Sequence, residues 1–443
     1  MTSSSRGRAL RWPASCLVLV TALIVTLSPR ALRAEAGEEL TVSVLTFGPG
    51  DHPFSKFGHD GILVEDEIRG SKLVYNYGTY AFDSYALIPK FLLGKYRYWL
   101  SVTQLASTLA TYAAENRSVT VQRLALTPSE KRELVEFLKW NARGENKYYE
   151  YDYYRDNCAT RIRDVVDRAS GGALQFAKTT PAALTFREHT LRLTADDFAV
   201  FLGLHGAMGP LIDRRVPLWD EMFLPGKLEE TLDRALIASP GLPPRRLVEA
   251  KELLVASDRP LPRNAPPRWT LGFLAAGVVV GAALASLGYQ AKRGHAMAAR
   301  VLGAFAVIFG AGAGLFGSLL LALATFTNHE VAYRNENILQ SAPVALGLVV
   351  PGIATLLGRE GLPSRLRHAA LLGFALSAAG LAFKILPWFP QDNRYFIALF
   401  LPIWAGLALA TLLTPGDSTH RLHREGPASG ETSGVERGDE IAR

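Results

Sequence analysis

One of the two cysteines in this sequence lies where a thiol can act as a nucleophile. Cys16 lies just ahead of the apolar core of the N-terminal segment, whereas Cys158 begins a helical pattern after a stretch rich in tyrosine and aspartate. If the N-terminal segment is removed, one thiol remains, and one thiol cannot form an intramolecular disulfide. The free N–H groups and the dipole at a helix start favour a thiolate. We therefore expect Cys158 to be a nucleophile; the alternative is a small buried apolar residue.

A histidine that can serve as the base for this thiol lies earlier in the chain. His59 follows Gly58, which permits close backbone approach, and it precedes a predicted strand. A histidine at the start of a strand is well placed to meet the start of a helix across a cleft. The alternative is a structural histidine in a turn. Spacing alone does not separate His59 from the other histidines of this region, His52, His189 and His205.

A cysteine–histidine pair usually needs a polar group that holds the imidazole in one tautomer. Asn76 and Tyr77, on the predicted strand after His59, are the candidates, and ordinary strand residues are the alternative. Asp60 and Asp156 are weaker candidates for the same role.

Other kinds of site find less support in the sequence. No pair of histidines or cysteines has the spacing of zinc ligands, and no phosphate-binding loop of the Walker type is present, so we expect neither a metal nor a cofactor. The net charge of +7 fits basic cytoplasmic loops of a membrane protein. Nucleic-acid binding is not expected, because no basic helix, zinc spacing or stacking motif accompanies the charge.

Alternating and helical patterns predict the elements that position these side chains. Thr127, Pro128 and Glu130 form a helix start with a capping box, and Gly144 ends that helix. A second helix begins near Cys158 and ends at two glycines. The predicted strands are residues 40–47, 61–65, 72–77 and 119–126, and the predicted helices are residues 104–115, 127–142 and 158–169.

The N-terminus has the order of a secretory signal. Arginines in residues 6–12 precede an apolar run over residues 14–27, and small residues follow at Ala31 and Ala34. We expect cleavage near Ala34; an uncleaved signal anchor is the alternative. Under both interpretations, the region that follows is exported across the membrane.

Five apolar stretches in the last third are each near the ~20 residues that cross a hydrocarbon core. If residues 35–267 lie outside, every loop that the alternating spans place in the cytoplasm is basic, as the positive-inside rule expects. The hydrophobic fraction of 49% agrees with a membrane protein. The stretches are residues 269–289, 299–325, 341–358, 368–387 and 394–414.

These patterns divide the chain into an α+β extracytoplasmic domain and a five-helix transmembrane domain. The loop between the second and third stretches faces the extracytoplasmic domain, and its His329, Asn335 and Asn337 are candidates for binding a lipid headgroup. A merely solvated loop is the alternative. The segments are a signal segment at 1–34, a thiol catalytic domain at 35–241, a short helix plus linker at 242–267, a transmembrane domain at 268–414 and a disordered cytoplasmic tail at 415–443.

Several motifs together resemble the Lnb family. The resemblance covers residues 40–225 well and extends less specifically into the membrane part through His329, Asn335, Asn337 and Pro343. The motifs are Gly48-Pro49-Gly50-Asp51, Phe57-Gly58-His59, Val74-Tyr75-Asn76-Tyr77-Gly78, Glu145-Asn146, Tyr151-Asp152 and Asp156-Asn157-Cys158-Ala159-Thr160-Arg161.

The resemblance implies a circularly permuted papain-like domain, related to NlpC-like and lecithin:retinol acyltransferase-like folds, in which the histidine precedes the cysteine. It also implies lipoprotein N-acyl transfer at the bacterial inner membrane, with a membrane lipid or a lipoprotein as the substrate. Tyr77, Asn157 and Arg161 are the implied substrate contacts. The rival functions are a papain-like cysteine peptidase or amidase that acts on cell-wall peptide, and a membrane receptor without catalysis.

Overall fold

A seven-stranded sheet forms the centre of the N-terminal domain, in the order β6-β4-β3-β2-β1-β5-β9. Each neighbouring pair of strands is antiparallel. The computed structural model describes residues 35–80, 97–239, 241–359 and 364–413, so the predicted signal segment and cytoplasmic tail lie outside the described residues. The strands are β1 (Leu40–Phe47), β2 (His59–Asp66), β3 (Ser71–Thr79), β4 (Arg97–Gln104), β5 (Val119–Leu124), β6 (Tyr148–Glu150) and β9 (Val248–Val255).

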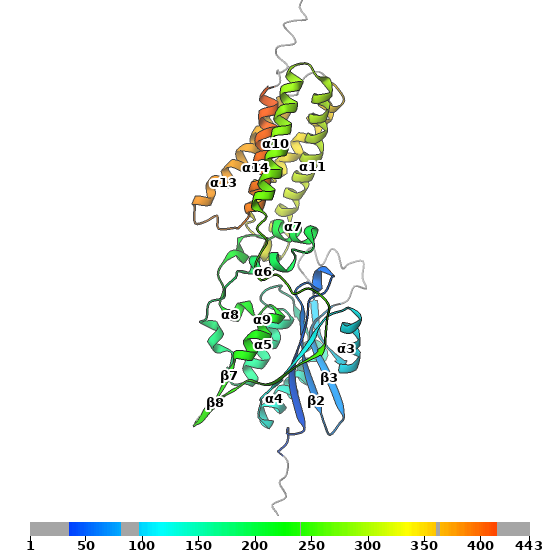
Figure 1. Ribbon diagram of the computed structural model, residues 1–443, viewed down its shortest axis with the longest axis vertical. Helices are drawn as coiled ribbons and strands as arrows, with labels where there is room; N and C mark the ends of the chain where they lie inside the picture. The colour runs from blue at the N-terminus through cyan, green and yellow to red at the C-terminus, as the bar shows by residue number, and fades with distance from the viewer. Residues whose placement is uncertain (1–34, 81–96, 240, 360–363, 414–443) are drawn as a thin grey trace, which may run out of the picture.

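Helices cover both faces of this sheet (Figure 1). On one face, α4 (Pro128–Asn141), α5 (Cys158–Ala169) and α9 (Pro225–Arg234) bury the larger apolar core. On the other face, α3 (Leu105–Ala114) covers a smaller core. The four predicted strands and three predicted helices are confirmed, including the capping box of Thr127 and Glu130.

The prediction of a short helix plus linker at residues 242–267 is wrong for its first half. Residues Leu242–Arg246 form β8, which pairs with β7 (Leu236–Ser239), and β9 then joins the central sheet beside β5. The residues of β9 include Ala, Lys, Glu and Leu, which favour helices when isolated. Pairing with β5 overrides that local preference, as is common for strands.

Short helices separate the sheet from the membrane bundle (Figure 1). They are α6 (Phe186–Leu193) and α7 (Phe198–Ala207), whereas α8 (Leu218–Glu221) lies beside α9. The short 3-10 helices of the described chain are η1 (Pro53–Ser55), η2 (Gly144–Lys147), η3 (Gln175–Lys178), η4 (Pro210–Asp213), η5 (Glu330–Ala332), η6 (Glu336–Leu339), η7 (Pro343–Leu348) and η8 (Phe383–Ile385).

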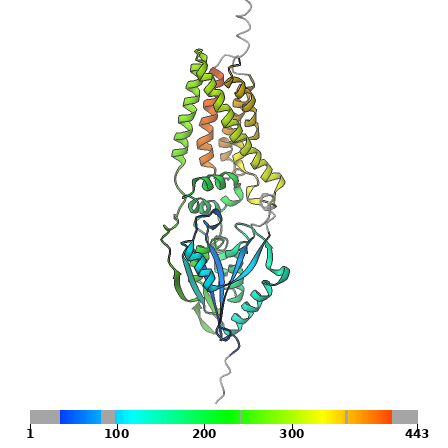
Figure 2. The same cartoon turned by 90° about the vertical axis from the view of Figure 1, so that its right-hand side faces the viewer.

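The C-terminal region is a bundle of long apolar helices, which stands at one end of the N-terminal domain in both views (Figure 2). The helices are α10 (Thr270–Lys292), α11 (Ala296–Phe326), α12 (Val349–Leu356), α13 (Ser364–Ala382) and α14 (Arg394–Leu413). Among the described residues, four of its helices are long and apolar enough to cross a membrane, and the number rises to five if a pair bent by 43° counts as one span.

That bent pair contains the third predicted stretch, residues 341–358, which forms η7 and α12 instead of one straight helix. Glycines of α11 mark its path: a methyl group added at Gly317 would meet Ser341, one at Gly310 would meet Leu348, and one at Gly303 would meet Leu356. The segment therefore runs antiparallel to α11 over about four turns of that helix. Small residues permit this close packing of helices within a membrane.

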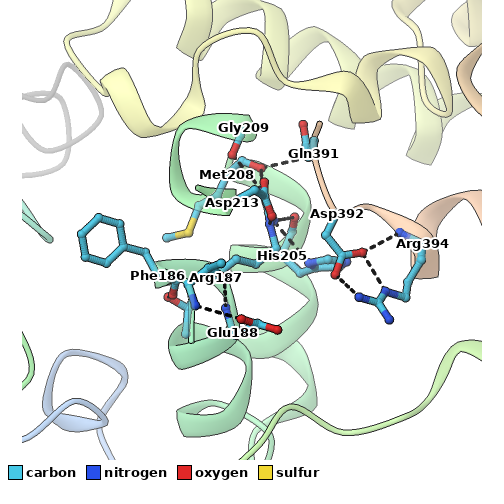
Figure 3. A network of polar contacts seen from close by, with 12 residues as sticks. Phe186, Arg187, Glu188, His205, Met208, Gly209, Asp213, Gln391, Asp392 and Arg394 are labelled. Carbon is cyan, nitrogen blue, oxygen red and sulfur yellow. Dashed lines mark hydrogen bonds and ion pairs between the residues drawn. The ribbon is translucent and has the colours of Figure 1, made fainter. Parts of the chain in front are cut away.

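A buried polar network joins the N-terminal domain to this bundle (Figure 3). Arg187 of α6 forms an ion pair of 2.7 Å with Asp213 of η4 and donates to the carbonyl oxygen of Met208 at 2.8 Å. The same carbonyl accepts a bond of 3.0 Å from Gln391, which precedes α14. Because a membrane-side residue and a sheet-side residue share one acceptor, the end of α7 is fixed between the two domains.

Candidate active site

Cys158 is the first residue of α5. Asn157 caps this helix through its side chain, which accepts from the Thr160 N–H at 3.0 Å, while the Thr160 hydroxyl accepts from the Asn157 N–H at 2.8 Å. The Asn157 amide also donates to the carbonyl oxygen of Phe223 at 2.9 Å. The cap therefore fixes both the start of the helix and the position of the thiol.

His59 is the first residue of β2, and it pairs with Phe47 at the end of β1. Its imidazole stacks on the Phe47 ring with centroids 5.6 Å apart, and Phe47 stacks in turn on Tyr112 of α3 at 3.9 Å. This row of rings holds the imidazole at the end of the sheet where α5 begins.

Gly78, in β3, brings the thiol and the imidazole together. A methyl group placed on Gly78 would lie 3.7 Å from Cys158 Cβ and 4.0 Å from His59 Cε1. The glycine has a φ of +92°, which side chains other than hydrogen rarely tolerate. The two groups thus border one small space that a side chain at this position would enter.

Asn76 is the polar neighbour of the imidazole. Its side chain hydrogen-bonds to His59, and its Nδ2 donates to Thr103 Oγ1 at 3.0 Å. With the amide nitrogen directed toward Thr103, the amide oxygen is the atom that accepts from the imidazole N–H. The weaker candidates have other surroundings: Asp156 forms an ion pair of 2.6 Å with Arg161, and Asp60 is fully buried at the next position of β2.

Burial governs the protonation of both groups. It raises the pKa of Cys158 to about 12, helped by the nearby Asp60 carboxyl, and the backbone N–H groups of Asp60, Cys158 and Ala159 offset only part of this. Burial also lowers the pKa of His59 to about 4, with a further contribution from Arg117. The expectation that the helix start yields a resting thiolate is therefore wrong, because desolvation outweighs the helix N-terminus. The resting pair is a neutral thiol and a neutral imidazole.

The pair opens into a cavity of about 960 Å³. This volume lies at the upper end of the ~300–1,000 Å³ found for small-molecule sites. The lining includes His59, Asn76, Gly78, Asn157 and Cys158, and it continues to α7 and to the membrane domain at Leu323, His329, Val331 and Ala332.

The predicted substrate contacts fall into two groups. Asn157 and His329 line the cavity, and the His329 ring stacks on Tyr153 with centroids 6.4 Å apart. The other four have protein partners away from the cavity lining. The Tyr77 hydroxyl bonds to Asn141 Oδ1 at 2.6 Å, Arg161 lies 3.8 Å over the Tyr149 ring, and Asn335 and Asn337 both donate to the Gly206 carbonyl.

These four side chains therefore position elements rather than face the cavity. Asn335 and Asn337 hold the loop after α11 against α7. Tyr77 and Arg161 lie on the α5 side of β3, where Tyr77 is buried in the main core. Alternation along a strand explains the difference between Asn76 and its neighbour, since successive side chains face opposite sides of the sheet.

Helix α7, whose residues Val200, Leu204 and Ala207 line the cavity, was not predicted from the sequence. Their spacing of four and three residues places them on one face of a helix. That apolar spacing was a usable signal. However, the helix is apolar nearly all round, so its pattern gives no clear polar face.

Comparison with known proteins gives one match. Residues 28–194 match the family model of the Lnb N-terminal periplasmic domain, which spans β1 to α6 and includes His59, Asn76 and Cys158. Searches of curated proteins and of solved structures gave no match. The predicted relationship to the Lnb family is confirmed over these residues, and this chain is a membrane protein that carries an Lnb N-terminal periplasmic domain.

Proposed function

We propose that this protein is a membrane-embedded, cysteine-dependent acyltransferase. It moves an O-acyl chain of a diacylglyceryl lipoprotein to an amine through a thioester on Cys158. The observation that carries the proposal is a single cavity whose lining includes both Cys158 and His59 and the membrane-domain residues Leu323 and Val331. A thiol site that the membrane domain helps to line suits a substrate with its acyl chains in the bilayer.

The first step forms the thioester. His59 takes the proton from Cys158 Sγ as the sulfur attacks the carbonyl carbon of the ester. The bond between that carbon and the glycerol oxygen then breaks, and His59 gives its proton to the leaving oxygen. Because both groups are neutral at rest, proton transfer accompanies the attack rather than precedes it.

The second step transfers the chain. The amine, which in this proposal is the lipoprotein's own N-terminal amine, attacks the thioester carbonyl. The carbon–sulfur bond breaks, His59 takes a proton from the nitrogen, and the sulfur recovers it. The products are an amide and the free thiol, together with the lyso-form glycerol left by the first step.

Backbone groups at the start of α5 support both steps. Thr160 N–H is engaged by the Asn157 side chain, whereas the N–H groups of Cys158 and Ala159 are directed toward the sulfur. Donors in this position can stabilise the negative charge that develops on the carbonyl oxygen of the ester or thioester when its carbon is attacked.

The membrane domain holds the active site close to the bilayer that contains the acyl chains of the substrate. Lifting an acyl chain out of lipid costs about 0.8 kcal/mol per methylene group, so a soluble domain alone would work against a large penalty. We propose five spans in the bacterial inner membrane, with the fifth formed by the bent segment beside α11. The chain order of His59, Asn76 and then Cys158 at a helix start supports a permuted papain-like arrangement.

The test is expression of the protein in a bacterial host that lacks lipoprotein N-acylation, followed by mass spectrometry of lipoprotein N-termini. The wild type is expected to give N-acylated lyso-form lipoproteins, and Cys158→Ala is expected to give none. Unchanged N-termini with the wild type would overturn the proposal. Cleaved cell-wall peptides in the same cells would favour the peptidase or amidase instead.

A further inference from the structure

The residues of helix α7 lie in three different environments: the protein interior, the exposed surface and the cavity. Phe201 and His205 are buried, and the Phe201 ring contacts Trp269 and Tyr395 with centroids 4.9 and 5.8 Å apart. Phe198, Ala199 and Gly203 are exposed. The third set, Val200, Leu204 and Ala207, is half-buried and lines the cavity that contains Cys158.

The cavity-facing stripe of α7 continues onto the membrane domain. Leu323, on the last turn of α11, lines the same cavity, as do Val331 and Ala332 of η5. The Gly209 N–H donates to the Val331 carbonyl at 2.7 Å, which holds η5 beside the end of α7. Other side chains of the final turns of α11, such as Leu321 and Phe326, are exposed, so an apolar outer surface extends to the end of the helix.

A second wall of the cavity differs in chemistry. It is formed by β4 and α3 and carries hydroxyl groups at Ser101, Thr103, Ser107, Thr108 and Thr111. Thr103 Oγ1 lies 2.9 Å from Thr108 Oγ1 and accepts from Asn76. An alkyl chain is therefore favoured along α7, whereas a glycerol or peptide group is favoured along α3.

We propose that Val200, Leu204 and Ala207 of α7, with Leu323, Val331 and Ala332 of the membrane domain, form the binding site for the acyl chain that is transferred to Cys158. The chain extends from the thiol toward the end of α11, and the glycerol and peptide lie against the hydroxyl wall. This inference rests on the proposed acyl transfer and adds the location and orientation of the substrate.

The experiment compares two alanines of α7. Ala207→Phe fills the cavity-facing stripe, and Ala199→Phe adds the same ring on the exposed face as a matched control. The purified full chain in detergent reacts with p-nitrophenyl palmitate and with p-nitrophenyl octanoate. The measured quantity is the ratio of the second-order rate constants for acylation by the two esters. Each reaction is monitored by the release of p-nitrophenol, and the acylation of Cys158 is verified by mass spectrometry.

We expect Ala207→Phe to lower the palmitate-to-octanoate ratio at least tenfold, since pocket contacts with single methylene groups alone discriminate about 10- to 200-fold. Ala199→Phe is expected to keep the wild-type ratio. Val200→Phe, about two helical turns away on the same stripe, is expected to lower the ratio as well, and it serves if Ala207→Phe does not fold. Wild-type ratios in both stripe variants would overturn the subsite while leaving thiol acylation intact.

The two proposals fail in distinguishable ways. If the wild type forms no acyl–Cys158 with either ester, or if Cys158→Ala releases p-nitrophenol at the wild-type rate, the proposed function fails and the subsite fails with it. If acyl–Cys158 forms and only the chain-length ratios are unaffected by the stripe variants, the function stands and the acyl chain lies elsewhere.

Discussion

At the scale of single residues, the site is set by desolvation. Cys158 and His59 would form an ion pair if the helix N-terminus dominated, but burial disfavours the charge on each of them. A neutral thiol is a weaker nucleophile than a thiolate, so the neutral pair lowers the reactivity of Cys158 at rest. This state suits an exported protein, because thiolates are the form that oxidises most readily.

The pH dependence of acylation tests this state. The pKa of His59 is lowered to about 4, so the imidazole is a free base at higher pH and becomes protonated only below that value. We expect the kcat/KM for acylation to fall as the pH drops through about 4, because kcat/KM reports the free enzyme. A fall centred near the ordinary histidine value of ~6.5 would contradict a buried neutral imidazole. His59→Gln should abolish acylation, and His295→Gln, at an exposed loop in the bundle, should not.

Gly78 provides a second test at this scale. Gly78→Ala places a methyl group 3.7 Å from Cys158 Cβ on a backbone with a φ of +92°. Gly70→Ala is the matched control, since Gly70 has a φ of +61° and open space around it. Both variants should lose about 1–2 kcal/mol of stability through backbone strain. Only Gly78→Ala should also lose acylation by more than tenfold, and equal losses of activity would show that the approach at Gly78 is unimportant.

At the scale of elements, the sequence predicted those whose signals are local. The capping box of Thr127, the alternation in β1 and the apolar face of α5 each lie within one short window. The strand β9 could not be predicted, because its residues favour a helix and only pairing with β5 makes it a strand. Cys158 and His59 were identified from type and order, whereas their common proximity to Gly78 depends on sheet register, which no local pattern contains.

The cap of α5 gives a prediction at this scale. Asn157→Ala removes the cap on Thr160 and leaves the Phe223 carbonyl without its amide donor. Thr127→Ala removes the equivalent cap of α4, away from the cavity. Both should lower the free energy of unfolding by about 1–2 kcal/mol in denaturant titrations. Acylation should fall only in Asn157→Ala, because only that cap positions the thiol; a loss of activity in Thr127→Ala as well would point to general destabilisation.

At the scale of the whole molecule, the two domains share a polar junction at the end of α7. Arg187 and Gln391 both donate to the Met208 carbonyl (Figure 3). Asn335 and Asn337 donate to the Gly206 carbonyl from the loop after α11. The wall of the cavity is therefore built jointly, and the soluble domain and the membrane domain must keep their relative position for the cavity to persist.

Breaking this junction should lower the stability of the protein substantially. Arg187→Met leaves the buried Asp213 carboxylate without its partner, and such a loss typically destabilises a protein by about 3–5 kcal/mol. Arg215→Met, on an exposed neighbour, is the control and should be nearly neutral. Thermal unfolding of the purified protein in detergent measures both. Similar melting temperatures for the two variants would contradict the role of the junction, and Asp213→Asn in the Arg187→Met background should recover part of the loss.

The central claim, a thioester on Cys158, is tested most directly by mass spectrometry of the protein itself. The full chain is incubated with a diacylglyceryl lipopeptide whose N-terminal amine is blocked, digested, and mapped before and after treatment with hydroxylamine. We predict that the peptide containing Cys158 gains the mass of one acyl chain, that hydroxylamine removes it, and that Cys158→Ala gains none. An acyl chain on another residue, or an unmodified Cys158 while the lipopeptide loses its chain, would contradict the account.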